Sequence, residues 1–264
     1  MSPDRETPAA DAQPLVDRML CIGAGLLEHG AEVYRVEEAL RRLGRAYGAS
    51  EFSAFVIPSA IILTLSLPGA PSVSKMRQTR VGDTNLDLVD QYNQLVRDLC
   101  AAPGDTRQID RRLAAIAARP GYPRWLQILV YGTGAASFAL FFGGSWQDAV
   151  VAGLIGALLR GMGMALRGIR QNAFFVNLLC AAAGSAIAQL TAAWLPGAAA
   201  DKITIGMLMT LVPGIVFTNA LRDFMAGDAL AGTIKVTEAL LIGAGIAVGV
   251  SVMLAVLQPV LGVV

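Results

Sequence analysis

Hydrophobic positions near the start of the chain predict an amphipathic helix from Leu15 to Tyr47. Its apolar residues recur at steps of three, four and seven, which places them on one stripe of a helix. They occupy positions 15, 19, 22, 26, 33, 36, 40 and 43. The opposite face pairs Glu37 with Arg41 and Glu38 with Arg42 at a spacing that is typical of a solvated surface. Gly30 either bends this helix or splits it in two.

Short segments rich in β-branched and aromatic residues follow, and turn residues separate them. They predict three antiparallel strands at Glu51 to Ile57, Ala60 to Leu67 and Ser72 to Val81. Helical spacing returns from Asn85 to Cys100 and from Asp105 to about Ala118. The sequence therefore predicts an α+β domain over residues 14–123, which ends in the proline-rich linker 120–123.

The pattern changes at Leu126 to long apolar segments. Five of them are close to the length that a helix needs to cross about 30 Å of hydrocarbon. They lie at about 126–142, 148–166, 173–194, 203–221 and 229–257. Small residues four apart predict close helix contacts at Ala152/Gly156, Ala182/Ala186 and Gly245/Gly249. The predicted fold is a membrane protein: an N-terminal α+β cytosolic domain, then an α-helical bundle of five transmembrane helices over 124–264.

The distribution of cationic residues predicts the orientation of these segments. Arg160, Arg167 and Arg170 cluster at the second connection and Arg222 lies at the fourth, whereas the first and third offer only Lys202. Cationic residues favour the cytoplasmic side, so the even-numbered connections are expected there. This places the N-terminal domain in the cytoplasm and the C-terminus outside a multi-pass inner-membrane protein.

Composition supports a membrane protein. The 264 residues are 55% hydrophobic, with a mean hydropathy of +0.55. Of the charged residues, 30 precede residue 126 and 11 follow it, and the net charge is only +1. This balance argues against a nucleic-acid partner, which requires a basic surface. The tryptophans, Trp125, Trp146 and Trp194, lie at predicted helix ends, where membrane interfaces favour them.

The ends of the chain and its cysteines add little chemistry. Residues 1–13 are polar, lack the features of a signal peptide and are expected to form a disordered leader. Cys21, Cys100 and Cys180 are too few for a disulfide framework and are expected to be reduced.

Candidate transport chemistry gathers around the fourth apolar segment. Pro213 and Gly214 lie at its middle and predict a kinked or interrupted helix at the bilayer midplane, where transporters bind substrate; a simple kink is the alternative. Polar residues follow at Asn219, Arg222, Asp223, Asp228, Lys235 and Glu238. Intramembrane charges cost at least about 2.5 kcal/mol each and suggest function. Lys235 and Glu238 either neutralise each other or form a proton or carboxylate site.

A second polar cluster lies in the first helix, at Glu28, His29, Glu32, Arg35 and Glu37. It is either a solvated face or a functional motif. His29 is the only histidine, so no histidine-rich zinc site is expected. The chain also lacks a phosphate-binding loop motif. We therefore expect neither a metal nor another cofactor.

Several of these motifs together resemble the threonine/serine exporter (ThrE-like) family. The resemblance rests on residues 29–37, the strand region 64–81, Asn85-Leu86-Asp87, Pro213-Gly214 with Thr218-Asn219, and Arg222-Asp223, Asp228, Gly232 and Glu238-Ala239. It implies the split, YjjP-type subunit of an exporter, with a short hydrophobic YjjB-like membrane subunit as partner. It also implies threonine, serine or succinate as substrate. The family commonly has arginine where this chain has Lys235, which leaves a bidentate carboxylate clamp in question.

The sequence thus predicts a subunit of a secondary exporter for small carboxylate metabolites, powered by the proton gradient. Five helices are few to enclose a transport path. We therefore expect the YjjB-like partner subunit, a homo-oligomer of the chain or both, surrounded by membrane lipid. The alternatives are a membrane-anchored enzyme or sensor that acts through the cytosolic cluster, and a binding scaffold.

Overall fold

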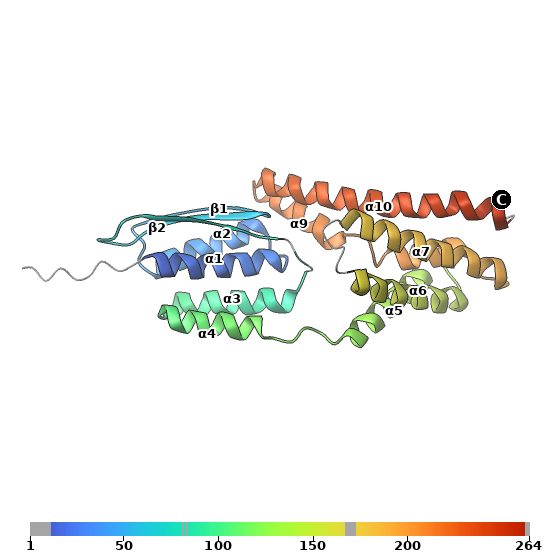
Figure 1. Ribbon diagram of the computed structural model, residues 1–264, viewed down its shortest axis with the longest axis horizontal. Helices are drawn as coiled ribbons and strands as arrows, with labels where there is room; N and C mark the ends of the chain where they lie inside the picture. Colours follow the sequence, from blue (N-terminus) through green and yellow to red (C-terminus); the bar gives the residue numbers. More distant parts are fainter. Residues whose placement is uncertain (1–11, 81, 83, 167–172, 262–264) are drawn as a thin grey trace, which may run out of the picture. The chain divides into compact units, whose positions relative to one another are not determined.

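The computed structural model describes residues 12–80, 82, 84–166 and 173–261 (Figure 1). The predicted leader up to residue 11, Arg167, Arg170 and Val264 lie outside the described residues. The chain forms two compact units. The first contains residues up to Pro120 together with Val216–Val236, and the second contains Gly121–Ile215 and Thr237 onward. Residues 216–236 therefore pack with the N-terminal elements, whereas the sequence prediction placed them with the membrane bundle.

The predicted first helix is two helices, α1 (Ala12–Glu28) and α2 (Val33–Ala46), separated at Gly30. All eight positions of the predicted apolar stripe are buried. The opposite face of α1 is buried as well, at Val16 and Leu20 among others, because α1 packs against the sheet and also against two later helices. A single stripe therefore describes α2 better than α1.

The three predicted strands are confirmed as β1 (Glu51–Ile57), β2 (Ala60–Ser66) and β3 (Val73–Gln78). They form an antiparallel sheet in the order β1-β2-β3. Alternate residues of β2 face inward, and Ile61, Leu63 and Leu65 are completely buried. On the outer face, Phe55 and Ile62 are paired across the strands and exposed.

Two helices complete the N-terminal elements of the first unit, α3 (Leu86–Ala101) and α4 (Thr106–Ala117). Asn85 and Asp105 cap them with side-chain oxygens, as short polar residues commonly do. The sheet, then α1 and α2, then α3 and α4 form three layers (Figure 1). Ala231, from the last helix of the chain, is completely buried in the same hydrophobic core.

The second unit is helical. It contains α5 (Arg124–Phe141), α6 (Trp146–Ala165), α7 (Ala173–Trp194), α8 (Ala200–Leu208) and most of α10 (Ala229–Leu261). The predicted fourth segment is interrupted, because α8 ends at Leu208 and α9 (Gly214–Met225) begins after Pro213. Each tryptophan lies within one residue of a helix end, as predicted, and is exposed.

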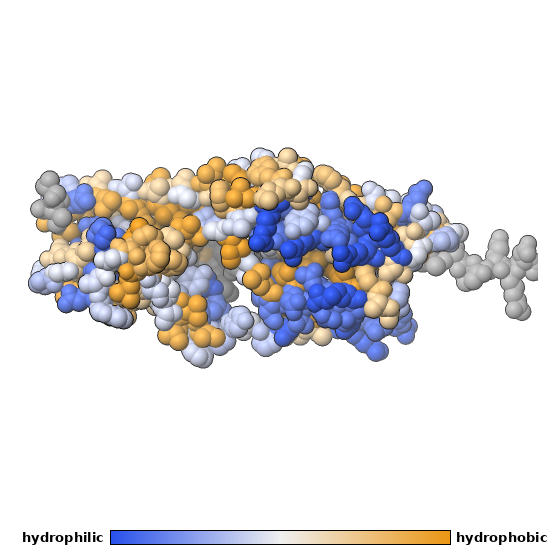
Figure 2. Space-filling view, turned by 180° about the vertical axis from the view of Figure 1, so that it is seen from behind, coloured by the Kyte–Doolittle hydropathy of each residue, from blue (hydrophilic) through white to orange (hydrophobic). Residues whose placement is uncertain are grey.

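Three of the described helices, α6, α7 and α10, are long and apolar enough to cross a membrane. The helix α5 and the interrupted segment are not among them, so the five-span bundle stays a prediction. Leu129, Leu154 and Leu241 are among many exposed leucines in this unit. Figure 2 shows hydrophobic side chains over much of its visible face, in contrast to the hydrophilic first unit. A surface of this kind fits lipid better than water.

The small residues of the second unit allow close helix contacts. A side chain added at Gly156 of α6 would lie 2.6 Å from Cβ of Ala135 in α5. One added at Gly245 of α10 would lie 2.7 Å from the carbonyl oxygen of Phe174 in α7. The predicted packing role of these glycines is therefore confirmed.

Candidate functional site

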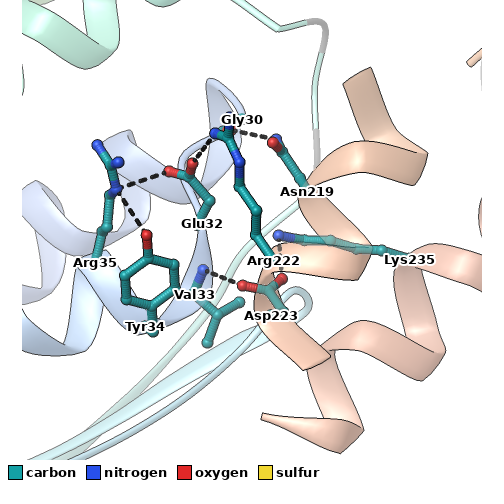
Figure 3. A network of polar contacts seen from close by, with 9 residues as sticks. All are labelled: Gly30, Glu32, Val33, Tyr34, Arg35, Asn219, Arg222, Asp223 and Lys235. Carbon is teal, nitrogen blue, oxygen red and sulfur yellow. Dashed lines mark hydrogen bonds and ion pairs between the residues drawn. The ribbon is translucent and has the colours of Figure 1, made fainter. Parts of the chain in front are cut away.

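Two predicted groups of residues meet in one polar network within the first unit (Figure 3). One side is the turn between α1 and α2 and the start of α2, from Gly30 to Arg35. The other side is α9 and the first two turns of α10. Residues about 190 positions apart in the sequence are in contact here.

Glu32 is held by two arginines. Nη1 of Arg222 donates to Oε1 of Glu32 at 2.8 Å, and Nε of Arg35 lies 3.3 Å from Oε2. Nε of Arg35 also donates to the Tyr34 hydroxyl at 3.1 Å. Burial raises the pKa of Glu32, but a backbone hydrogen bond and the two arginines outweigh it and lower the pKa overall. Glu32 is therefore a firmly ionised carboxylate.

Asp223 is completely buried, and both of its oxygens accept hydrogen bonds. Oδ1 accepts from the backbone N–H of Val33 at 3.2 Å, and Oδ2 accepts from Nζ of Lys235 at 2.7 Å. Asp223 lies two residues beyond the predicted fourth span. Burial raises its pKa and Asp228 adds to the rise, although Lys235 and Val33 act in the opposite direction. Asp223 therefore takes up a proton more readily than an ordinary aspartate.

A third contact ties α9 to the turn itself. Nδ2 of Asn219 donates to the carbonyl oxygen of Gly30 at 3.2 Å. Gly30 has φ +94°, and a side chain there would also lie within 3.1 Å of the Thr84 side chain. The turn therefore requires glycine at this position.

The remaining predicted residues of the first unit have local contacts. Nδ1 of His29 lies 2.6 Å from the Gly25 carbonyl oxygen. Glu37 accepts a hydrogen bond from the backbone N–H of Val56, and burial raises its pKa. Asp228 accepts from the backbone N–H of Ala231 at 3.0 Å and caps α10. Of these contacts, that of Glu37 joins α2 to β1, and all three lie outside the network of Figure 3.

Pro213 and Gly214 lie in a different part of the chain from the charged residues. A cavity of about 330 Å³ in the second unit is lined by Pro213, Leu208 and Val212 and by residues of α10 that include Gly243 and Ser251. Its lining is apolar except for Ser251, and none of the predicted charged residues lines it. Glu238, half-buried and three residues after Lys235, is also part of the second unit. The predicted path residues are thus divided between the two units.

The network contains ion pairs between cationic side chains and carboxylates. Lys235 and Arg222 each contact a carboxylate within the protein, as they could contact a carboxylate of a substrate. Asp223 is the ion-pair partner of Lys235 in the structure. The sequence left open whether Lys235 and Glu238 neutralise each other or form a proton or carboxylate site. Within the described ranges, no group of three or more His, Cys, Asp or Glu residues is arranged to hold a metal.

Comparison with protein families gives one match. The model described as "Putative threonine/serine exporter" matches residues 17–257 of the chain, which includes every residue of the network. No solved structure matches the chain.

Similar proteins carry two kinds of name. The chain is 30% identical over 239 residues to the "Probable succinate transporter subunit YjjP" of Escherichia coli, with 88% of this chain and 91% of that protein aligned. It is 29% identical over 240 residues to the protein of the same name in Klebsiella aerogenes, with 88% and 90% aligned. It is 24% identical over 246 residues to a "Probable threonine/serine exporter" of Mycobacterium tuberculosis, with 91% of this chain but only 46% of that protein aligned.

Proposed function

Because the chain belongs to the threonine/serine exporter family, we propose that it is a subunit of a proton-coupled secondary exporter. It carries a small carboxylate metabolite, threonine, serine or a succinate-like dicarboxylate, out across the inner membrane. The observation that carries this proposal is the buried pair of Asp223 and Lys235. The carboxylate of Asp223 has a raised pKa, and in the described network it is the only charged partner of the Lys235 ammonium.

The proposed cycle exchanges the partner of Lys235. When Asp223 takes up a proton, it gives up its negative charge, and Lys235 becomes available to a substrate carboxylate. When Asp223 loses the proton on the outer side, it competes for Lys235 and favours release of the substrate. The proton and the substrate therefore leave together, and the outward gradient of the substrate drives the step. The charged groups that act on Asp223 are Lys235 from α10 and Asp228, which precedes α10, whereas Arg222 and Glu32 pair with each other in the same network.

The ion pair of Glu32 with Arg222 has a different role in this proposal. The pair stays charged at neutral pH, because the pKa of Glu32 is lowered. It therefore holds the turn of the N-terminal unit to α9 throughout the cycle. The N-terminal unit, with His29, Arg35 and Glu37, then acts as a cytoplasmic gate or assembly element.

We also propose that the transport path needs a second protein component. The chain spans less than half of the mycobacterial exporter, and the relatives named YjjP are named as subunits. A short hydrophobic, YjjB-like membrane subunit or further copies of the chain would supply the missing helices. Exposed apolar residues along α10, such as Leu240 and Val252, give such a partner or the lipid a surface to cover.

An enzyme or sensor that acts through the cytosolic cluster receives less support. Glu32 is bound to two arginines and Glu37 to a backbone N–H, so both carboxylates are engaged in contacts of the fold. A general base or ligand-binding carboxylate needs an oxygen that is free to reach its target.

The experiment is efflux from proteoliposomes that contain the chain and its partner. Asp223→Asn keeps the shape of the side chain but cannot exchange a proton. We expect it to abolish acceleration of efflux by a pH gradient, with the protein level unchanged. The matched control is Asp90→Asn, which makes the same change at an exposed aspartate of α3 outside the network, and we expect it to keep gradient-dependent efflux. Glu238→Gln tests the other acid near Lys235. Gradient-dependent efflux by Asp223→Asn at the normal rate would contradict the proposed role of Asp223.

A further inference from the structure

Arg160 of α6 is a cation within a candidate membrane span. The side chain is half-buried and lies against α5, where its Nη2 donates to Oε1 of Gln127. Its guanidinium carbon lies 4.6 Å from the centre of the Tyr131 ring. The close contact between α5 and α6 at Gly156, one turn earlier, brings these side chains together.

Among the described residues, the contacts of Arg160 give its charge no opposite charge. In the described part of α6, α7 and α10, the cations are Arg160 and Lys235. Lys235 is paired with Asp223, whereas no described residue offers Arg160 a carboxylate. An aromatic ring and an amide compensate a charge only in part. A charge kept in a membrane segment at such a cost suggests a function.

One donor of Arg160 also has no acceptor. Its Nε–H is buried and makes no hydrogen bond to any described residue. Unpaired buried donors are rare, because they lose their hydrogen bonds to water without replacement. The planar guanidinium is well suited to bind a carboxylate through two parallel hydrogen bonds. The uncompensated charge and the planar shape of the guanidinium therefore favour a carboxylate as ligand.

The position of Arg160 fits the start of an export path. Arg160 is five residues before the end of α6, and Gln127 is three residues after the start of α5. At 1.5 Å per residue, both lie about one to two turns inside the ends of their helices. The arginine distribution predicts that these ends face the cytoplasm, from which an exported metabolite would enter.

We propose that Arg160, supported by Gln127 and Tyr131, is a carboxylate-binding site for the exported metabolite at the cytoplasmic end of the second unit. This inference rests on the proposed function and adds a second substrate contact to it, separate from Lys235. Gln127 and Tyr131 are positioning residues, which hold the guanidinium in place against α5.

The test measures succinate and threonine efflux from proteoliposomes that contain the chain and its partner, with the substrate concentration varied. We expect Arg160→Gln to raise the half-saturating concentration at least tenfold, with a maximal rate within about twofold of the wild type. Arg160→Lys keeps the charge but not the planar fork, and we expect an intermediate rise. Dimethyl succinate, which lacks ionised carboxylates, should compete poorly with succinate in the wild type and show no difference between the wild type and Arg160→Gln.

The matched control is Arg124→Gln. It removes an exposed cation at the start of α5, so it changes the charge of the same helix ends without touching Gln127 or Tyr131. We expect its half-saturating concentration to equal that of the wild type. Measuring membrane orientation and partner binding for both variants separates substrate binding from assembly.

Three results would overturn the inference and leave the proposed function intact. An unchanged half-saturating concentration in Arg160→Gln would mean that Arg160 binds no ligand. A loss of efflux that follows loss of the partner subunit would mean that Arg160 binds a carboxylate of the partner. An effect of Arg160→Gln that appears only with anionic lipids would mean that Arg160 binds a lipid headgroup. If the wild type exports no carboxylate at all, the proposed function itself fails.

Discussion

Glu32 and Asp223 are carboxylates of the same network, yet their pKa values move in opposite directions. For Glu32, the backbone hydrogen bond and two arginines outweigh burial, whereas for Asp223 burial outweighs Lys235 and Val33. Burial is thus the main cause of the shift at Asp223, and the backbone hydrogen bond and the arginines are the causes of the opposite shift at Glu32.

The lowered pKa of Glu32 predicts how stability depends on pH. The folded protein binds this proton less tightly than the unfolded chain, so the stabilisation is present above the ordinary glutamate pKa of about 4.3 and is lost as the pH falls toward the native value. At pH 7 we expect Glu32→Gln to lower the free energy of unfolding by about 1 to 2 kcal/mol, a modest amount because Arg222 is half exposed. The difference from wild type should shrink below about pH 4.3.

Thermal unfolding of the full chain in detergent, at several pH values, measures this difference. Glu38→Gln is the control, because it removes an exposed ion pair with Arg42 from the same helix. We expect that variant to stay within about 0.5 kcal/mol of the wild type. A difference for Glu32→Gln that stays constant from pH 7 to pH 4 would contradict the prediction.

At the scale of elements, the most unusual feature is the interruption between α8 and α9. Pro213 has no backbone N–H, so the helical hydrogen bond that would join the two helices cannot form there. Gly214 follows in open space, with no atom near the position of a side chain. The cavity of about 330 Å³ lies against this interruption and α10. We infer that export uses the freedom of the interrupted segment.

Pro213→Ala tests this directly. Alanine restores the N–H and favours a continuous helix from α8 to α9, so we expect efflux to fall about tenfold while the folded protein loses no more than about 1 kcal/mol. Efflux from proteoliposomes and thermal unfolding of the same preparations give the two values. Pro259→Ala removes the proline inside α10 and should leave efflux unchanged. Normal efflux by Pro213→Ala would show that the interruption is only a kink.

Sequence patterns predicted elements well where the reason for an element is local. The three strands, the capped helices α3 and α4 and the apolar stripe of α1 and α2 depend on alternation, caps and helical spacing. The second buried face of α1 was missed, because its cause is the helix α3 on the other side. On that face, Gly25 of α1 leaves room for the ring of Tyr92 in α3, and the pattern of residues within α1 does not predict that contact.

The candidate site shows the same limit more clearly. Asp223, Arg222 and Glu32 were each identified from their type and surroundings, but in separate groups. Their contact depends on α9 packing against a turn about 190 residues earlier, and one of the partners is a backbone N–H, which carries no sequence signal. An aspartate in an apolar stretch of sequence does indicate that its carboxylate has a hydrogen-bond or charge partner, but it does not identify that partner.

At the scale of the whole molecule, the arginine distribution makes a prediction about orientation. Reporter fusions at Ala118 and at Val264 should report opposite sides of the membrane, with Ala118 in the cytoplasm. An odd number of crossings is the physical reason, since the described helices include three candidate spans and the sequence predicts five. Activity of both fusions on the same side would mean that the number of crossings is even.

The first unit is built from two pieces of chain that are separated by about a hundred residues. During synthesis, the ribosome completes Pro120 long before it reaches Val216, and at about 5 to 20 residues per second the delay is on the order of 5 to 20 s. In this interval the core lacks Ala231, and Glu32 lacks Arg222. The first unit therefore stays incomplete while the helices between its two pieces leave the ribosome. A chaperone or the insertion machinery can act on it during that time.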